Sequence, residues 1–398
     1  MFLVIKMERI IMHIDVNNAF LSWSAIDLLN NGSKYDIRDS YAVIGGDPKA
    51  RKGIVLAKST PAKKRGVKTA ETLFSAKNKC PALRVYPPNF NFYHKMSDAM
   101  FDILANYTSD IEIASIDECY LDYGKIKKIN GDEVAFAYKI QKEIYEKLGF
   151  TVNVGVANNK LCAKMASDFS KPFKVHTCFN YEIKEKMFPL PIGDLFGVGK
   201  RTEATLKEMG INTIGDLAIF PLDELQKKFK NQALHLKTIA NGVDLSPVVS
   251  EKVDPKCIST TNTLSSDAKK IPEVLEILKS QAESIGLELR KKNKYAYVVA
   301  ALVKNKDFVS SSKQLKLNNP TNISDEIYNL AANLIKDVWD PNGIRLVGIR
   351  VSSLVSNYYY QPNMFENNFK NEENLKLEKA IDAIKEKYGV NKINKGIK

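Results

Sequence analysis

The chain has 398 residues, of which 44% are hydrophobic and 26% charged, so it has the composition of an ordinary folded protein rather than a disordered or fibrous one. Its formal net charge of +13 points to a polyanionic partner such as nucleic acid, and the absence of a long apolar run argues against a membrane protein. Five scattered cysteines without a C-x-x-C pair argue against a disulfide framework and a structural zinc site, so we expect reduced thiols and a cytoplasmic protein.

The first 178 residues have the pattern of a sheet with helices. Residues 10–16 (IIMHIDV) form a β-branched, apolar run that predicts a buried strand. Apolar residues then recur at helical spacing before an N-G stop, so a helix should carry Phe20 just beyond the strand end. Further strands are expected at 41–46, 53–59, 111–123 and 151–157, and further helices near 91–107, 132–148 and 159–169. Strands that alternate with helices predict an α+β or α/β domain.

The character of the sequence changes after residue 178. Residues 179–250 predict a small all-helical domain, because G-x-G and M-G-I-N turns separate short helical stretches. Residues 251–257 resemble a linker. Residues 258–357 alternate strands such as YAYVVAALV with two helical stretches, which predicts a second α+β domain. The polar, Asn-rich tail that follows contains a charged helix, expected over 373–387.

Two adjacent acids, Asp117 and Glu118, lie in the otherwise apolar stretch SIDECYLD, and Asp15 ends the first strand. Burying unpaired carboxylates is costly, so such acids need a compensating charge. Two-metal phosphoryl transfer requires carboxylates that converge on two cations, and Mg²⁺ needs only a few of them besides water and phosphate oxygens. The acids therefore indicate a metal site at a bend between strands. A solvated hairpin turn remains the alternative for an isolated D-E pair.

Two further segments suit phosphate. In VNVGVANNKLCAKMASDFSKP a strand and a polar turn lead into a helix with Lys160 and Lys164, and cations beside a helix start favour phosphate. A solvated lysine is the alternative, more so for Lys164. FGVGKRTEATLKEMGI resembles a helix-hairpin-helix, in which Gly197, Gly199 and Lys200 would present backbone amides and charge to a DNA phosphate.

Five segments in order resemble the Y-family, or translesion, DNA polymerases, and most closely the bacterial DNA polymerase IV branch. They are HIDVNNAF, AKSTPAKKRGVKT, IASIDECYLD, VGVANNKLCAKMASDFSKP and IGDLFGVGKRT, and the resemblance covers roughly residues 10–357. It implies an α+β multidomain protein with the right-hand polymerase fold. The implied parts are a palm over 10–22 and 80–178, small fingers over 23–79, a helical thumb over 179–250, a linker over 251–257, an α+β little finger over 258–357 and a tail over 358–398.

The same resemblance implies template-directed addition of dNMP from dNTP to a primer 3′-OH, with low fidelity and without proofreading. The partners would be primer–template DNA and dNTP, the cofactor two Mg²⁺ ions, and the protein a monomer. Asp15, Asp117 and Glu118 would be the metal ligands, helped by the backbone carbonyl of Val16. Phe20 falls at the steric-gate position, where its ring would leave no room for a ribose 2′-OH.

Three more residues fall at family positions that contact the triphosphate: Thr60, Lys63 and Lys160. Thr60 and Lys63 stand where the family usually has Tyr and Arg. Lysine lacks the planar fork of arginine, so this departure affects how the β- and γ-phosphates are oriented. Residues 17–19 also depart from the family pattern beside the nascent base pair, so no lesion preference is inferred.

The tail contains YYYQPNMFENN, in which Gln361, Met364 and Phe365 fit the Q-x-x-[LM]-F peptides that bind the bacterial sliding clamp. The amide can hydrogen-bond, and the Met-Phe pair can fill an apolar pocket. Docking of this pair on the protein's own surface is the alternative.

Two other functions compete with the polymerase. The stretch Asp110-Ile111-Glu112 is a D-x-E pair of the kind found in exonuclease sites, although no downstream acid cluster accompanies it. A DNA-binding accessory protein without catalytic activity is the second alternative, against which the presence of all three carboxylates argues.

Overall fold

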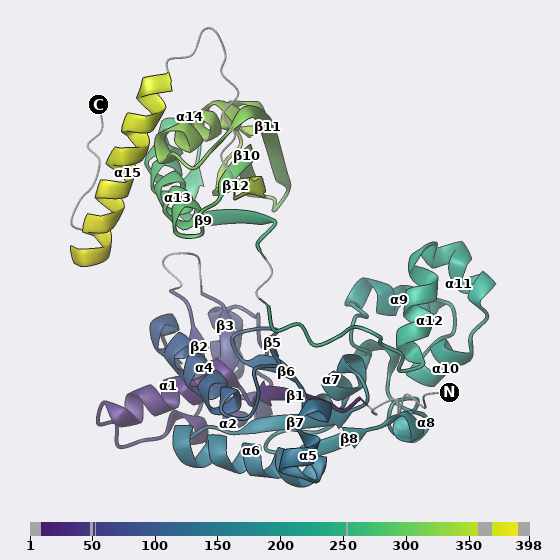
Figure 1. Ribbon diagram of the computed structural model, residues 1–398. Helices are drawn as coiled ribbons and strands as arrows, with labels where there is room; N and C mark the ends of the chain where they lie inside the picture. Colours follow the sequence, from purple (N-terminus) through teal and green to yellow (C-terminus); the bar gives the residue numbers. More distant parts are fainter. Residues whose placement is uncertain (1–8, 48–50, 52, 252–253, 357–367, 389–398) are drawn as a thin grey trace. The chain divides into compact units, whose positions relative to one another are not determined.

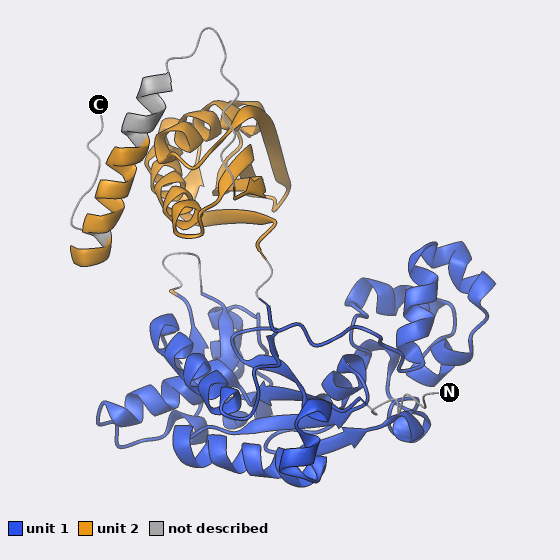
Figure 2. Cartoon of the chain, viewed as in Figure 1, with its two compact units in different colours: residues 1–46, 53–252 blue, residues 47–52, 253–398 orange. Residues whose placement is uncertain are grey.

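The computed structural model describes residues 9–47, 51, 53–251, 254–356 and 368–388. The chain divides into two compact units, residues 1–46 with 53–252 and residues 47–52 with 253–398 (Figure 2), and each is described by itself. None of the described helices combines the length and apolar character that a membrane span requires.

A five-stranded sheet forms the centre of the first unit (Figure 1). Its strand order is β5-β6-β1-β7-β8. The strands are β1 (Ile11–Val16), β5 (Ile111–Ile113), β6 (Glu118–Asp122), β7 (Val152–Ala157) and β8 (Val175–Cys178). β1 lies in the middle and pairs antiparallel with both β6 and β7, so the β-branched run IIMHIDV is buried on both sides, as its composition predicts.

The two faces of β1 pack against different helices, because alternate side chains of a strand point to opposite faces. Met12, Ile14 and Val16 belong to one apolar core, which lies under three helices. These helices are α1 (Ala19–Asn30), α4 (Phe90–Ala105) and α6 (Glu133–Leu148). His13 and Asp15 face the other way and contact α7 (Lys160–Asp168) and the loop after it. A short helix, α5 (Lys127–Asn130), precedes α6.

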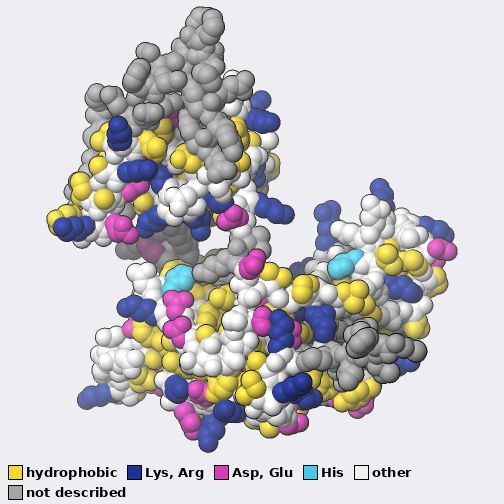
Figure 3. Space-filling view, viewed as in Figure 1, with side chains coloured by type: hydrophobic (Ala, Val, Ile, Leu, Met, Phe, Trp, Pro, Cys, Tyr) yellow, Lys and Arg dark blue, Asp and Glu magenta, His cyan; other side chains and the backbone are white. Residues whose placement is uncertain are grey.

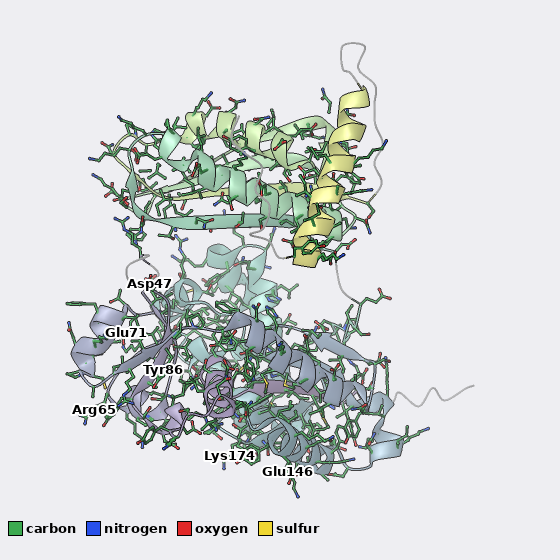
Figure 4. The ribbon with its side chains drawn as sticks, turned by 90° about the vertical axis from the view of Figure 1, so that its left-hand side faces the viewer. Asp47, Arg65, Glu71, Tyr86, Glu146 and Lys174 are labelled. Carbon is green, nitrogen blue, oxygen red and sulfur yellow. The ribbon has the colours of Figure 1, made fainter. Side chains whose placement is uncertain are left out.

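A smaller three-stranded sheet, of order β3-β2-β4, forms a second part of this unit. Its elements are β2 (Ala42–Gly45), β3 (Val55–Lys58), α2 (Thr60–Lys64), α3 (Leu73–Lys79) and β4 (Arg84–Tyr86). Glu71, labelled in Figure 4, joins the loop before α3 to the helix itself. It accepts hydrogen bonds from the backbone N–H of Lys68 (2.7 Å) and from Ser75 Oγ (2.9 Å). This part is therefore a small folded body with its own apolar core.

Short helices make up the rest of the first unit, as the sequence predicts. They are α8 (Ile183–Lys186), α9 (Lys200–Glu208), α10 (Ile214–Ile219), α11 (Leu222–Phe229) and α12 (Gln232–Ala240). Thr213 caps the start of α10 in a capping box. The Thr213 side chain accepts the backbone N–H of Asp216, and the Asp216 side chain accepts the backbone N–H of Thr213. Apolar residues of these helices share one core with Leu161, Cys162 and Met165 of α7. The helical region is thus packed onto the sheet region through α7.

The second unit is a four-stranded antiparallel sheet of order β11-β10-β12-β9 with helices. Its elements are β9 (Cys257–Ala268), α13 (Pro272–Lys291), β10 (Tyr295–Asn305), β11 (Ser310–Thr321), α14 (Ser324–Leu334), β12 (Ile344–Val355) and α15 (Asn368–Tyr388). Its core lies between the sheet and α13 with α14. Arg290 of α13 holds α15 through Glu378 Oε2 (3.0 Å) and Asp382 Oδ2 (2.5 Å), so the charged tail helix docks on this unit.

Candidate active site

Three acids meet at one end of the large sheet. In the β1–β6 ladder Asp15 lies directly opposite Glu118, so both carboxylates stand on the face that α7 covers. Asp117 lies in the bend before β6, where Ser115 Oγ donates to its carboxylate (2.6 Å) and its carbonyl accepts the N–H of Val16 (3.0 Å). This bend lets two adjacent acids reach the same place, which a regular strand would not allow.

The acids line a cavity of about 330 Å³. Its walls are Asp15, Val16, Asn18, Ala19, Phe20, Leu56, Ala57, Asp117, Glu118 and Lys171. The cavity therefore brings together the β1 end, the start of α1, the strand β3 of the small sheet and the loop after α7. Five of the residues that the sequence assigns to the site lie here, namely Asp15, Val16, Phe20, Asp117 and Glu118.

Two lysines offset the negative charge of Asp15 and Glu118. Lys164 Nζ donates to Asp15 Oδ2 (3.1 Å) and Glu118 Oε1 (3.2 Å) and lies 3.4 Å from Asp168 Oδ2. Lys171 Nζ donates to Asp15 Oδ1 (2.8 Å) and contacts Asp168 Oδ1 (2.9 Å). Lys164 is only 8% exposed, so the alternative of a solvated lysine is wrong for this residue.

His13 is a member of the cluster that sequence reasoning missed. Its fully buried ring places Nδ1 2.8 Å from Ser167 Oγ and Nε2 3.4 Å from Glu118 Oε2. Burial lowers the pKa of this imidazole. The alternation of IIMHIDV was a usable signal, because His13 is two residues before Asp15 and therefore on the same face.

Burial and neighbouring groups shift the pKa values of the side chains in this cluster. The neighbouring His13 ring and the Lys164 ammonium hold the pKa of Glu118 at about 2, although burial opposes them. Burial raises the pKa of Asp117, and the charges of Asp15 and Glu118 act in the same direction. Burial would lower the pKa of Lys164, but the carboxylates of Asp15, Asp168 and Glu118 raise it by more. Lys164 is accordingly a fixed positive charge.

The donor atoms fit divalent cations. One ligand atom each from His13, Asp15 and Glu118 lie within 4.8 Å of one another, and Asp117 lines the same cavity. Carboxylate oxygens are the ligands that Mg²⁺ prefers, and it completes its shell with water and phosphate.

An aromatic cluster supports the part of the cavity wall that Phe20 forms. The Phe20 ring stacks on Tyr93 with centroids 4.9 Å apart and planes at 12°, and Phe90 meets it edge-on at 5.8 Å. Tyr93 is itself fixed, because its hydroxyl lies 2.5 Å from the buried Ser24 Oγ. Phe20 is thus held in one orientation while part of its surface faces the cavity.

Comparison with known proteins identifies the family. Residues 14–168 match the impB/mucB/samB family, residues 255–364 its C-terminal domain, and residues 193–244 the thumb domain described for DNA polymerase-iota. The chain is 42% identical over 392 residues to the DNA polymerase IV of Clostridium acetobutylicum, covering 98% of each protein. The chain belongs to the Y-family of DNA polymerases.

Two further relatives agree. The chain is 33% identical over 392 residues to DNA polymerase IV 1 of Bacillus subtilis, covering 98% of this chain and 93% of that protein. A solved Y-family DNA polymerase chimera of Dbh and Dpo4 superposes with a TM-score of 0.76 at 26% identity, covering 87% of this chain and all of the other. The predicted fold and function are therefore confirmed: the protein is a translesion DNA polymerase with palm, fingers, helical thumb and α+β little finger.

The Y-family polymerases depend on metal ions, and the structure of this chain contains an acidic cluster that could hold them. The comparisons favour the polymerase over the accessory protein and the exonuclease. In the structure both acids of the D-x-E pair are matched by lysines, Asp110 by Lys125 (3.0 Å) and Glu112 by Lys160 (2.6 Å).

The other residues that the family resemblance assigns to the triphosphate do not line the cavity. Thr60 and Lys63 are exposed on α2, directly after β3. Lys160 Nζ donates to both Glu112 oxygens (2.6 and 2.8 Å) and lies 5.0 Å from the centre of the Tyr120 ring. Lys171, which the sequence analysis did not single out, is the lysine that lines the cavity.

The hairpin of the thumb is exposed. Gly197 has φ of 95°, a conformation that favours glycine, and Gly199 is the N-cap of α9, whose first residue is Lys200. A Cβ added at Gly199 would meet no heavy atom within 4 Å, so the hairpin presents an open surface. Gln361, Met364 and Phe365 lie outside the described residues.

Proposed function

We propose that Asp15, Asp117 and Glu118 hold two Mg²⁺ ions in this polymerase, with help from the backbone carbonyl of Val16. The observation that carries the proposal is the convergence of the three acids on one cavity, which Phe20 also lines. Two cations bound there would lower the pKa of the primer 3′-OH and neutralise charge on the leaving pyrophosphate. The acids position the cations, and the palm sheet holds the acids rigidly.

We propose that Phe20 is the steric gate. Its ring lines the cavity and is supported from behind by Tyr93 and Phe90, so it cannot rotate away from a nucleotide sugar without disturbing a packed aromatic cluster. A ring held in this way would exclude a 2′-OH and favour dNTP over NTP.

We propose that Lys171 contacts the triphosphate. Its ammonium reaches Asp15 from the cavity wall, and its side chain is 36% exposed, so a phosphate can approach it. Thr60 and Lys63 on α2 are proposed to reach the same triphosphate, since β3 just before them contributes Leu56 and Ala57 to the wall. The family resemblance also names Lys160, but its close pairing with Glu112 leaves it less available.

DNA would be bound mainly through its backbone. We propose that Gly197, Gly199 and Lys200 of the thumb contact a phosphate, as a helix-hairpin-helix does without reading bases. Positive charge supports this mode, because Figure 3 shows Lys and Arg side chains on both units, and Lys313 and Lys316 are exposed on β11 of the little finger.

The proposed limits of the parts are 10–22 and 80–178 for the palm, 23–79 for the fingers, 179–250 for the thumb, 251–257 for the linker, 258–357 for the little finger and 358–398 for the tail.

Five further properties rest on the sequence and on the family resemblance. We propose a cytoplasmic monomer that copies DNA with low fidelity and without proofreading, and that Gln361, Met364 and Phe365 tether it to the sliding clamp. Tethering would raise the local concentration of the polymerase at the primer end.

Primer extension tests the proposed site. Asp117→Asn keeps the shape of the side chain but removes the charge, so nucleotide addition in Mg²⁺ should fall by at least about a thousandfold if two-metal chemistry supplies several kcal/mol. Primer–template binding, measured by fluorescence anisotropy, should stay near the wild-type value because the thumb and little finger supply it. Extension at the wild-type rate would show that the metal-site assignment is wrong.

A further inference from the structure

A buried lysine bridges two of the three acids of the site. Lys164 Nζ lies between carboxylate oxygens of two neighbouring strands, 3.1 Å from Asp15 on β1 and 3.2 Å from Glu118 on β6. We propose that Lys164 is a resident cation: it holds these two acids together in the enzyme without nucleotide and weakens their binding of divalent cations. The inference rests on the proposed metal site and adds to it a residue that controls when the site is filled.

Burial distinguishes Lys164 from its neighbour Lys171. The side chain of Lys164 is 10% exposed and that of Lys171 is 36% exposed. Lys164 also has a third acidic partner one turn along its own helix, Asp168, at 3.4 Å. Three carboxylates around one ammonium hold it in place, whereas Lys171 can exchange Asp15 for a phosphate that enters the cavity.

The fold determines the position of Lys164. Gly155 on β7 lets α7 approach the sheet so closely that a Cβ there would lie 1.9 Å from the Ala163 carbonyl oxygen. The residue after Ala163 is Lys164, and its side chain therefore enters the sheet at the level of the acids. Ser167, one turn further, contacts His13 on the same strand as Asp15 (2.8 Å), so α7 is held against β1 at two points.

Charge explains the consequence for cations. A divalent cation that binds Asp15 and Glu118 comes within a few ångströms of the Lys164 ammonium, which contacts the same two carboxylates. The two positive charges then repel each other. An incoming triphosphate brings several negative charges and its own oxygen ligands, which offset this repulsion. Cations are then bound tightly only together with the nucleotide, when they can be used.

Binding of Mn²⁺ to the full-length protein, followed by electron paramagnetic resonance without DNA or nucleotide, tests the proposal. Lys164→Met removes the charge, and Mn²⁺ should then bind about tenfold more tightly or better. Lys164→Arg keeps the charge and should bind as weakly as wild type. Lys160→Met is the matched control: Lys160 lies on the same helix and pairs with Glu112, away from the acids, so its loss should leave Mn²⁺ binding unchanged.

Thermal unfolding provides a second readout. Without Lys164 the paired acids repel each other, so Lys164→Met should melt at a lower temperature in chelator than wild type and should be stabilised more by Mg²⁺. If this variant does not fold, Lys164→Gln, whose amide can still donate to both carboxylates, carries the same expectation for Mn²⁺. Equal Mn²⁺ affinity in wild type and the uncharged variant would overturn the inference. Extension that does not need Asp117 would instead overturn the metal site itself.

Discussion

Gly155 is the position at which one added methyl group should disturb both the stability and the active site. It lies in the middle of β7, and α7 crosses it at backbone contact. A Cβ at Gly155 would lie 1.9 Å from the Ala163 oxygen and 2.5 Å from the Ser167 nitrogen. Both atoms belong to the backbone of a helix, so neither can rotate aside. Restoring an ordinary contact would need α7 to move outward by roughly 1.5 Å.

The expected cost of Gly155→Ala follows from this geometry. Overpacking a core costs about 1–3 kcal/mol, and a clash with two backbone atoms should fall at or above the upper end, about 3 kcal/mol. Because α7 carries Lys164, nucleotide addition should also fall under conditions where the variant is still folded. Urea unfolding gives the change in the free energy of unfolding, and single-nucleotide addition gives the activity.

Gly199→Ala is the stability control, since a Cβ there meets no heavy atom within 4 Å and the backbone φ is −82°. Its free energy of unfolding should stay within about 0.5 kcal/mol of wild type. A Gly155→Ala protein that unfolds in urea like wild type and adds nucleotides at the wild-type rate would refute the argument that close helix–strand approach positions the site.

Two further predictions concern selectivity and DNA. Phe20→Ala should strongly raise ribonucleotide incorporation, and Tyr93→Leu should raise it less because this change removes only the ring that supports Phe20. Single-nucleotide assays with dNTP and NTP compare the variants. Unchanged discrimination in Phe20→Ala would show that Phe20 has a purely structural role. DNA affinity should fall with salt at a log–log slope of about −5 if roughly six phosphates are contacted; anisotropy titrations at several salt concentrations measure the slope, and a slope near zero would contradict binding to the DNA backbone.

Local pattern predicted β1, α1 and α7 at the site, but not the short helix α2 that carries Thr60 and Lys63. The β-branched run at 10–16 became β1, and the acids of SIDECYLD lie at a bend because Asp117 precedes the strand and Glu118 begins it. Five ordered segments also sufficed to predict the fold and the family, since they recur together in one class of enzyme. These features are encoded over a few residues each.

The lysines could not be placed in the same way. Lys160 and Lys164 are one turn apart on a helix, and the spacing puts them on similar faces without indicating which one meets the acids. That depends on where α7 crosses the sheet, which the glycine at position 155 decides through a long-range contact. Lys171 follows the helix in a loop, and its reach to Asp15 is likewise a tertiary feature.

The choice between Lys171 and Lys160 as the triphosphate contact is open to a direct test. A hydrogen bond to a charged group contributes about 1.5–3 kcal/mol, so Lys171→Met should raise the KM for dNTP by roughly ten- to a hundredfold. Lys160→Met should leave that KM within about twofold of wild type, because its ammonium is held by Glu112. It should instead lower the melting temperature, since the Glu112 side chain, only 24% exposed, would lose its main partner. Steady-state kinetics with one templated nucleotide separate the two. If Lys160→Met raises the KM and Lys171→Met does not, Lys160 at the start of α7 contacts the nucleotide, as the family resemblance implies. Lys171 would then only offset the negative charge of Asp15.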